Sequence, residues 1–148
     1  MTAADDEDLF EHWLAHMDDA LAEFFTRVPP ALRAALDFAP ASLDRLEAFL
    51  LERYPSVEAI KADPEPYLDG AARYVGEVFR RHIGGRWRMR MDDPKYVYAG
   101  LPELTFSPTQ DTPVCPITLV SASLDRRTGA FISSVFDNSA KRIASARG

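Results

Sequence analysis

Cysteine is almost absent from this sequence: Cys115 stands alone in 148 residues, so no disulfide can form within the chain. No apolar run approaches the roughly 20 residues that a membrane-spanning helix requires. The opening residues, MTAADDEDLF, contain neither the basic start nor the apolar stretch of a signal peptide. These absences predict a chain that folds without disulfides, has no membrane partner and resides in the cytoplasm.

Motifs for common enzyme chemistry are missing as well. There is no glycine-rich phosphate-binding loop. No nucleophile-elbow sequence surrounds Ser121, Ser123, Ser133 or Ser134. The sequence therefore predicts no cofactor, no metal and no catalytic residue; it leaves enzymatic activity open and favours a protein that is not an enzyme.

The composition is that of one ordinary globular domain. Hydrophobic residues make up 47% of the chain, enough to bury a substantial core without further cross-links. We expect a single domain over residues 1–148, with short flexible termini at about 1–5 and 140–148.

The net charge of −6 is unevenly distributed. Residues 1–70 carry 16 acidic and 5 basic residues, whereas residues 71–90 carry one acid, Glu77, against six arginines. Because affinity for phosphate backbones depends on summed positive charge, the acidic chain predicts no nucleic-acid partner. The arginine-rich segment leaves a local anion site open.

Apolar residues recur at three- and four-residue spacing in several segments, which predicts amphipathic helices. The first runs from Asp8 to Val28, and a short helical turn covers residues 31–36. A second helix spans 42–54, with Ser42 as its N-cap. A third spans 64–83, with Asp63 as N-cap and Pro64 at the first helical position.

The third helix is predicted to face the core on one side only. Its core side consists of Ala71, Tyr74, Val75, Val78, Phe79 and His82. Its opposite side carries Arg73, Glu77 and Arg80. Gly84 provides the left-handed residue that commonly ends a helix.

After Gly85 the period changes to simple alternation. Trp87, Met89 and Met91 alternate with Arg86, Arg88 and Arg90, which predicts a half-buried strand whose arginines face solvent. The segment YVYAG, residues 96–100, is predicted as a second, antiparallel strand, and ELTF, residues 103–106, as a third. Residues 107–114 form a predicted loop.

Residues 115–127 suit a strand or a helix. We favour a helix, since Pro116 fits a first turn and Gly129 an end. The predicted fold class is α+β: several helices packed on a small antiparallel sheet of two to three strands.

The arginine ladder of the predicted strand, Arg86, Arg88 and Arg90, has two interpretations. Planar guanidinium groups can clamp a phosphate or carboxylate. The alternative, which we favour, is a solvated strand face paired with neighbouring acids.

Two polar residues of the third helix are further candidates. Glu77 follows Gly76. A glycine inside a helix lowers its stability, so we expect that another segment's backbone packs closely against Gly76. Glu77 is expected to pair with Arg73 and Arg81, which argues against a general base. His82 is interpreted as a buried neutral histidine bonded to a backbone carbonyl.

Two weaker candidates involve metal and thiol chemistry. His12 and His16 stand one helical turn apart, near Asp8 and Asp19, but nothing elsewhere completes a metal site. Cys115, at a predicted helix start, would have a lowered pKa as a nucleophile, yet a packing role is the better interpretation.

Three segments carry a family resemblance: LDFAPASLDRLEAFL, YLDGAARYVGEVFRRHIGGRWRMR and CPITLVSASLDRRTG. They resemble an actinobacterial family of small proteins classed only as a domain of unknown function. The resemblance runs from about Leu36 to Phe136. A looser pattern, a Gly-Glu helix followed by a Gly-Gly-x-Trp strand, is similar to that of small uncharacterised bacterial proteins, some regarded as immunity or interaction proteins. It implies a fold and no reaction, so no catalytic residue is transferred.

Two functions follow from these observations. The first is a non-enzymatic cytoplasmic protein that binds a macromolecule, an unknown protein partner, as an accessory or inhibitor-like factor; a homodimer is left open. The alternative is a small-molecule anion-binding module or enzyme that uses Arg81, Arg86, Arg88 and Arg90 with Glu77 or His82.

Overall fold

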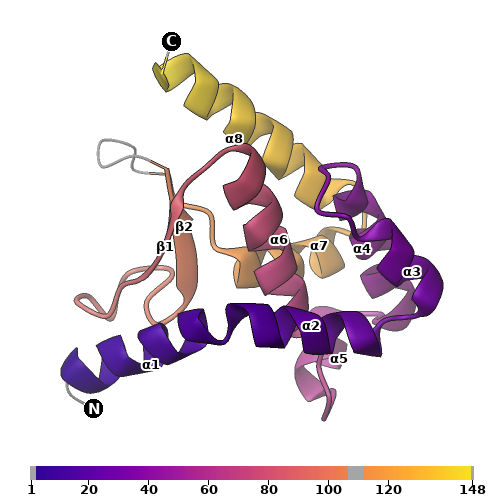
Figure 1. Ribbon diagram of the computed structural model, residues 1–148, viewed down its shortest axis with the longest axis horizontal. Coiled ribbons are helices and arrows are strands. Elements are labelled where there is room, and N and C mark those ends of the chain that lie inside the picture. Colours follow the sequence, from indigo (N-terminus) through magenta and orange to yellow (C-terminus); the bar gives the residue numbers. More distant parts are fainter. Residues whose placement is uncertain (1–2, 107–111, 148) are drawn as a thin grey trace.

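The computed structural model describes residues 3–106 and 112–147 and shows helices packed around a two-stranded antiparallel sheet (Figure 1). The helices are α1 (Ala3–Ala15), α2 (Met17–Arg27), α3 (Pro30–Ala35), α4 (Ser42–Arg53), α5 (Val57–Ala62), α6 (Leu68–His82), α7 (Pro116–Arg126) and α8 (Phe131–Arg147). The strands are β1 (Arg86–Met89) and β2 (Pro102–Thr105). The α+β class predicted from the sequence is confirmed.

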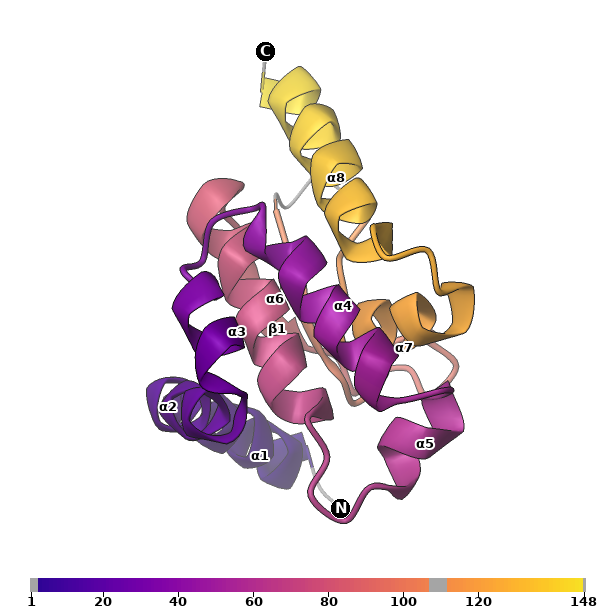
Figure 2. The ribbon, with the colours of Figure 1, turned by 90° about the vertical axis from the view of Figure 1, so that its right-hand side faces the viewer.

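Helix α6 lies at the centre of the molecule. It packs against α2, α7 and β2, and α4 runs alongside it in Figure 2. Every residue from Ala71 to Phe79 is buried, including Arg73 at 4% exposure and Glu77 at 6%. The prediction that Arg73 and Glu77 face solvent is wrong, because α6 is surrounded by other elements on all sides rather than on one.

The first predicted helix is two helices that meet at His16. His16 has φ −85° and ψ 5°, and the backbone hydrogen bonds continue across it, from His16 N to His12 O and from Ala20 N to His16 O. The two helices have different partners: α1 packs on β1, whereas α2 packs on α6. The predicted start at Asp8 is also too late, since α1 begins at Ala3.

Two predicted N-caps are wrong. Asp63 accepts hydrogen bonds from Glu65 N and from the Tyr54 hydroxyl, and Arg27 binds the carbonyls of Glu65 and Pro66. These bonds hold residues 63–66 out of the helix, so α6 begins at Leu68. The Ser42 hydroxyl donates to Ala39 O rather than accepting from the helix, and it lies 2.6 Å from the Tyr74 hydroxyl.

The sheet joins β1 directly to β2. Arg86 pairs with Thr105 and Arg88 with Glu103 in an antiparallel register, and Leu104 forms an isolated bridge to Val114. The predicted strand at 96–100 is wrong: these residues form successive turns, with Tyr96 N bonded to Asp93 O and Ala99 N to Tyr96 O. The segment ELTF supplies the partner strand instead.

The ends of α6 and α7 show two left-handed terminations. Gly84 has φ 101°, as predicted for the residue that ends the helix, and its N–H donates to the carbonyls of Phe79 and Arg80 in the last turns of α6. The helix favoured for residues 115–127 is confirmed over 116–126, but it ends at Arg127, with φ 57°, and not at Gly129. The Arg127 guanidinium donates to Leu51 O and Tyr54 O, so the same residue ends α7 and ties it to the end of α4.

The sheet is covered by α1, α6 and α7, while α4 makes its main contacts with α3, α7 and α8. The helix predicted over 42–54 therefore packs mainly on other helices. Helix α8 extends to Arg147, with Ile143 buried. Residues 1–2 and 148 of the predicted flexible termini, and residues 107–111 of the predicted loop, lie outside the described residues.

Candidate functional site

The six residues predicted to bind a ligand or partner lie at the end of α6 and along β1, but they do not converge on one point. They are Glu77, Arg81, His82, Arg86, Arg88 and Arg90. Of these, Glu77 and Arg86 line a common cleft. The other four are engaged elsewhere, each with an identifiable partner.

Two arginines of the ladder are paired with acids. The Nε of Arg88 donates to the buried carboxylate of Glu103, 2.9 Å away, and the Tyr96 hydroxyl donates to the other oxygen of Glu103. Arg90 makes two hydrogen bonds to Asp92, at 3.1 and 3.0 Å, and lies over the Tyr96 ring. The hydrogen bonds from Arg90 lower the pKa of Asp92. This is the strand-face pairing that the sequence favoured.

Arg81 and His82 both contact the loop after α3. The Arg81 guanidinium stacks on the Phe38 ring, 3.7 Å from its centroid, and His82 Nε2 lies 2.8 Å from Phe38 O. The predicted bond from His82 to a backbone carbonyl is present. The predicted burial of His82 is wrong, since α6 ends here and the imidazole is exposed.

Glu77 pairs with Arg80, not with the predicted Arg73 and Arg81. Arg80 donates to both carboxylate oxygens, from Nε at 2.6 Å and from Nη2 at 3.2 Å, and this bond raises the pKa of Arg80. Arg73 instead donates to Asp69 and to Trp13 O, and its guanidinium stacks on the Trp13 ring. With both oxygens engaged, Glu77 is held as one half of an ion pair.

Gly76 is explained by a side chain rather than by the predicted neighbouring backbone. A Cβ at this position would lie 2.1 Å from Cη2 and 2.3 Å from Cζ2 of Trp87. The Trp87 indole packs edge-on against Trp13, with ring centroids 5.0 Å apart. Because Gly76 has no Cβ, the Trp87 ring can pack directly on α6. Together with its contact to Trp13, this packing holds β1 against α6 and α1.

A cleft of about 430 Å³ opens where the α1–α2 junction, α6 and β1 meet. We call it the Arg86 cleft. It is lined by Leu14, Met17, Asp18, Glu77, Arg80, Gly85, Arg86 and Trp87. Leu14 is 38% exposed, which is high for a leucine of a packed helix.

The charges of the Arg86 cleft differ in how they are satisfied. Glu77 and Arg80 neutralise each other. The side chains of Arg86, from β1, and Asp18, from α2, have no hydrogen bond or ion pair within the described part of the chain. The cleft therefore presents one unpaired cation and one unpaired anion beside an apolar wall of Leu14, Met17 and Trp87.

Sequence reasoning identified Glu77 and Arg86 but missed Leu14, Asp18 and Arg80 as their neighbours. Leu14 and Asp18 are more than 50 positions away along the chain, and local spacing carries no information about such distant contacts. The available signal was the tryptophan pair: Trp13 and Trp87 meet and bring α1 to β1.

The other two candidates have plain structural roles. His12 and His16 contact each other edge-on, and His16 lies 4.0 Å from Asp19. Over residues 3–106 and 112–147, no three His, Cys, Asp or Glu side chains are grouped so as to hold a metal ion. Cys115 is buried, and burial raises the pKa of its thiol rather than lowering it.

Comparison of the chain with protein-family models, with curated proteins and with solved structures finds no match. Within the described residues, none of the helices has the length and apolar character needed to cross a membrane. The class that fold and cleft define is an α+β protein of helices on a two-stranded sheet, with a cleft of mixed apolar and charged lining beside the Trp13–Trp87 pair.

Proposed function

We propose that the protein is a non-enzymatic binding protein that holds a segment of a protein partner in the Arg86 cleft. The observation that carries the proposal is the lining of the cleft: an apolar wall that includes the exposed Leu14, with an unpaired Arg86 and an unpaired Asp18 beside it. Protein interfaces combine an apolar centre with charges that give specificity.

The partner segment is expected to present an apolar side chain flanked by charges of both signs. Its carboxylate would pair with Arg86 and its cation with Asp18. The acidic character of residues 1–70 adds a long-range attraction for a partner with a basic surface. The proposal includes the cytoplasmic location and the accessory or inhibitor-like role that the sequence analysis favoured.

Affinity capture from the source organism tests the proposal, with Arg86→Glu and Leu14→Glu compared against wild type. We expect a partner whose recovery falls about tenfold in both variants, because Arg86→Glu removes a charge pair and Leu14→Glu places a carboxylate in the apolar wall. The matched control is Arg90→Glu, which reverses the same charge at the end of β1 but outside the cleft, and it should recover the partner as wild type does.

A charge-swap experiment then separates direct contact from indirect effects. A carboxylate of the captured partner, changed to arginine, should restore binding to Arg86→Glu and weaken binding to wild type in calorimetry. Equal recovery of all partners by wild type, Arg86→Glu and Leu14→Glu would contradict the proposal.

A small-anion module is the second candidate, favoured by the unpaired guanidinium of Arg86 in a cleft of about 430 Å³. The two carboxylates in the same lining, Asp18 and Glu77, oppose it, because a site for a free anion gathers cations without acids. Titration with inorganic phosphate and with citrate decides this: heat that disappears in Arg86→Glu indicates the small-anion module, and no heat at millimolar concentration excludes these anions.

A further inference from the structure

A second cleft, of about 390 Å³, lies between α7, α8 and the segments at 97–98 and 112–114. Its lining is Val97, Tyr98, Thr112, Pro113, Val114, Cys115, Thr118, Leu119, Ala122, Phe131, Val135, Ser139 and Arg142. We call it the Arg142 cleft. The α8 residues recur at three- and four-residue spacing, as do the α7 residues, so each helix presents one face to the cleft.

The Arg142 cleft differs from the Arg86 cleft in its charges. Arg142 is the single charged residue among the described residues that line it, and none of them is acidic. The remaining lining is mainly apolar, with Leu119, Phe131 and Val135 contributed by the two helices. A cation without a countercharge in an apolar cleft attracts an anion of single charge.

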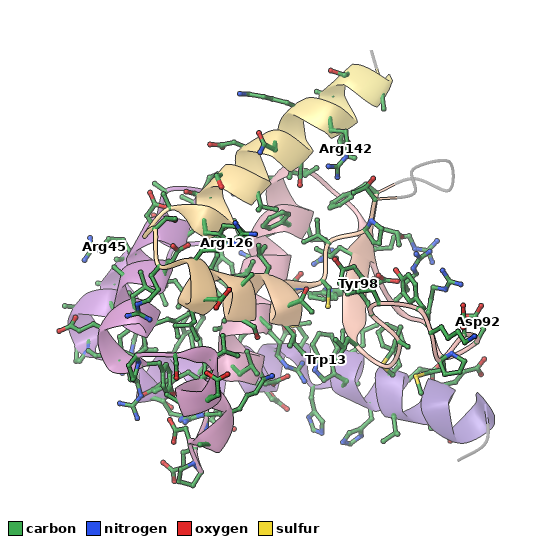
Figure 3. All side chains as sticks on the ribbon, turned by 180° about the vertical axis from the view of Figure 1, so that it is seen from behind. Trp13, Arg45, Asp92, Tyr98, Arg126 and Arg142 are labelled. Carbon is green, nitrogen blue, oxygen red and sulfur yellow. The ribbon has the colours of Figure 1, made fainter. Side chains whose placement is uncertain are left out.

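Arg142 itself has unused hydrogen-bonding capacity. Its Nε is buried and has no acceptor among the residues that the structure describes. Its Nη2 donates to Thr112 O at 3.4 Å, the long end of the range for such a bond. Figure 3 shows Arg142 on the side of α8 that faces the strands, above Tyr98. A buried N–H without an acceptor has lost its hydrogen bond to water and gained none in return. Binding of a ligand that supplies a hydrogen-bond acceptor there is therefore favoured.

We propose that the Arg142 cleft binds a small apolar monocarboxylate. The carboxylate accepts hydrogen bonds from Nε and a terminal nitrogen of Arg142, since the two oxygens match the guanidinium fork. The apolar body lies along Leu119, Phe131 and Val135. A phosphate dianion fits less well, because the described lining supplies a single cation against two negative charges.

Cys115 provides a built-in reporter for this cleft. It is the sole cysteine of the chain, it lines the cleft and it is 2% exposed. Burial raises the pKa of its thiol, so its alkylation is slow and sensitive to any further loss of access. A ligand in the cleft should slow the reaction of Cys115 with N-ethylmaleimide.

The test uses octanoate and, as its uncharged counterpart, 1-octanol, with the full chain. Calorimetry should show octanoate binding to wild type about tenfold more tightly than 1-octanol, and saturating octanoate should slow Cys115 alkylation at least about threefold. Arg142→Gln should remove the preference for octanoate, and Arg142→Lys should retain part of it through its charge. Circular dichroism confirms that the variants fold.

Arg45→Gln is the matched control, because it removes the same charge from an exposed position on α4, on the other side of the molecule from Arg142 (Figure 3). It should bind octanoate as wild type does. The proposal is overturned if octanoate does not bind, if it binds without protecting Cys115, or if Arg142→Gln and Arg45→Gln bind it equally well. None of these outcomes tests the separate proposal that the Arg86 cleft binds a protein partner.

Discussion

Buried charged side chains act as ties between elements at the residue scale. Glu103 on β2 accepts hydrogen bonds from Arg88 on β1 and from the Tyr96 hydroxyl. Arg73 joins α6 to α1 through Trp13 O. Each of these two buried charges is thus met by a partner of opposite charge or by other polar groups, which is the condition under which charge burial is tolerated.

Glu47 is the clearest of these ties. It is fully buried on α4, and its two carboxylate oxygens accept the backbone N–H groups of Phe131 and Ile132, at 3.1 and 2.8 Å. The N–H groups in the first turn of a helix have no acceptor within the helix itself, and the helix dipole favours negative charge at this end. Glu47 therefore acts as a cap supplied by a distant helix.

Replacement of Glu47 tests this capping role. In Glu47→Gln one acceptor becomes an amide NH₂ that faces a backbone N–H, so we expect the free energy of unfolding to fall by about 1–3 kcal/mol. Urea denaturation followed by circular dichroism measures it. Glu52→Gln, an exposed position on the same helix, should change stability little. Equal losses in the two variants would show that Glu47 is not a cap.

At the scale of elements, the packing of α6 against β1 depends on Gly76. Glycine in a helix interior costs about 1 kcal/mol relative to alanine. The chain accepts this cost because the Trp87 ring occupies the space where a Cβ would be. The helix and the strand that follows it are therefore joined by a direct contact as well as by the turn at Gly84–Gly85.

Gly76→Ala is expected to destabilise the protein by about 1–3 kcal/mol, because displacing Trp87 outweighs the helix-propensity gain. Urea denaturation of a double-mutant cycle with Trp87→Leu checks the cause. In the Trp87→Leu background, Gly76→Ala should be neutral or stabilising by up to about 1 kcal/mol. If Gly76→Ala costs the same in both backgrounds, the contact with Trp87 is not its reason.

At the scale of the whole molecule, three tyrosines in separate regions share one property. Burial raises the pKa of Tyr54, at the end of α4, of Tyr74, within α6, and of Tyr96, in the loop after β1. Tyr74 is fully buried among α4, α6 and the Phe38 loop. Each tyrosine keeps its proton to a higher pH in the folded chain than in the unfolded chain.

The sign of the resulting pH dependence follows from linkage. Because the folded pKa lies above the unfolded value of about 10, this contribution to stability is complete below pH 10 and is lost as the pH rises further. We expect the free energy of unfolding to fall steadily above pH 10, and Tyr74→Phe to have a shallower fall from a lower starting stability, since it loses the bonds to Ser42 and Phe38.

Urea denaturation at a series of pH values measures this, with circular dichroism and tryptophan fluorescence as separate probes. A single domain over residues 1–148 predicts coincident transitions from the two probes. Stability that is constant from pH 9 to pH 11 would contradict the burial of the tyrosine hydroxyls.

Features that depend on neighbours along the chain were predictable. The helical period of 42–54 and of 116–126, the end of α6 at Gly84 and the alternation of Trp87 with Arg86 and Arg88 are all confirmed. Each arises from steric and hydrogen-bonding preferences within a few residues, so the sequence contains the whole cause.

Features that depend on distant contacts were not predictable. The YVYAG segment has the composition of a strand, but β1 pairs with residues 102–105 instead. Asp63 has the character of an N-cap, but Tyr54 and the bonds from Arg27 to nearby carbonyls hold that region out of the helix. Local propensity is a weak force that tertiary packing overrides.

The sequence by itself determined the α+β class, most helices, the first strand and the residue types from which a site could be built. Only the tertiary structure decided that residues 71–79 of α6 are buried on every side and that Arg142 faces an apolar cleft. It also decided that Arg81, Arg88 and Arg90 are engaged, whereas the side chain of Arg86 has no partner among the described residues. The physical reason is one of range: backbone geometry acts within a turn or two, whereas burial and charge pairing depend on which distant elements come into contact.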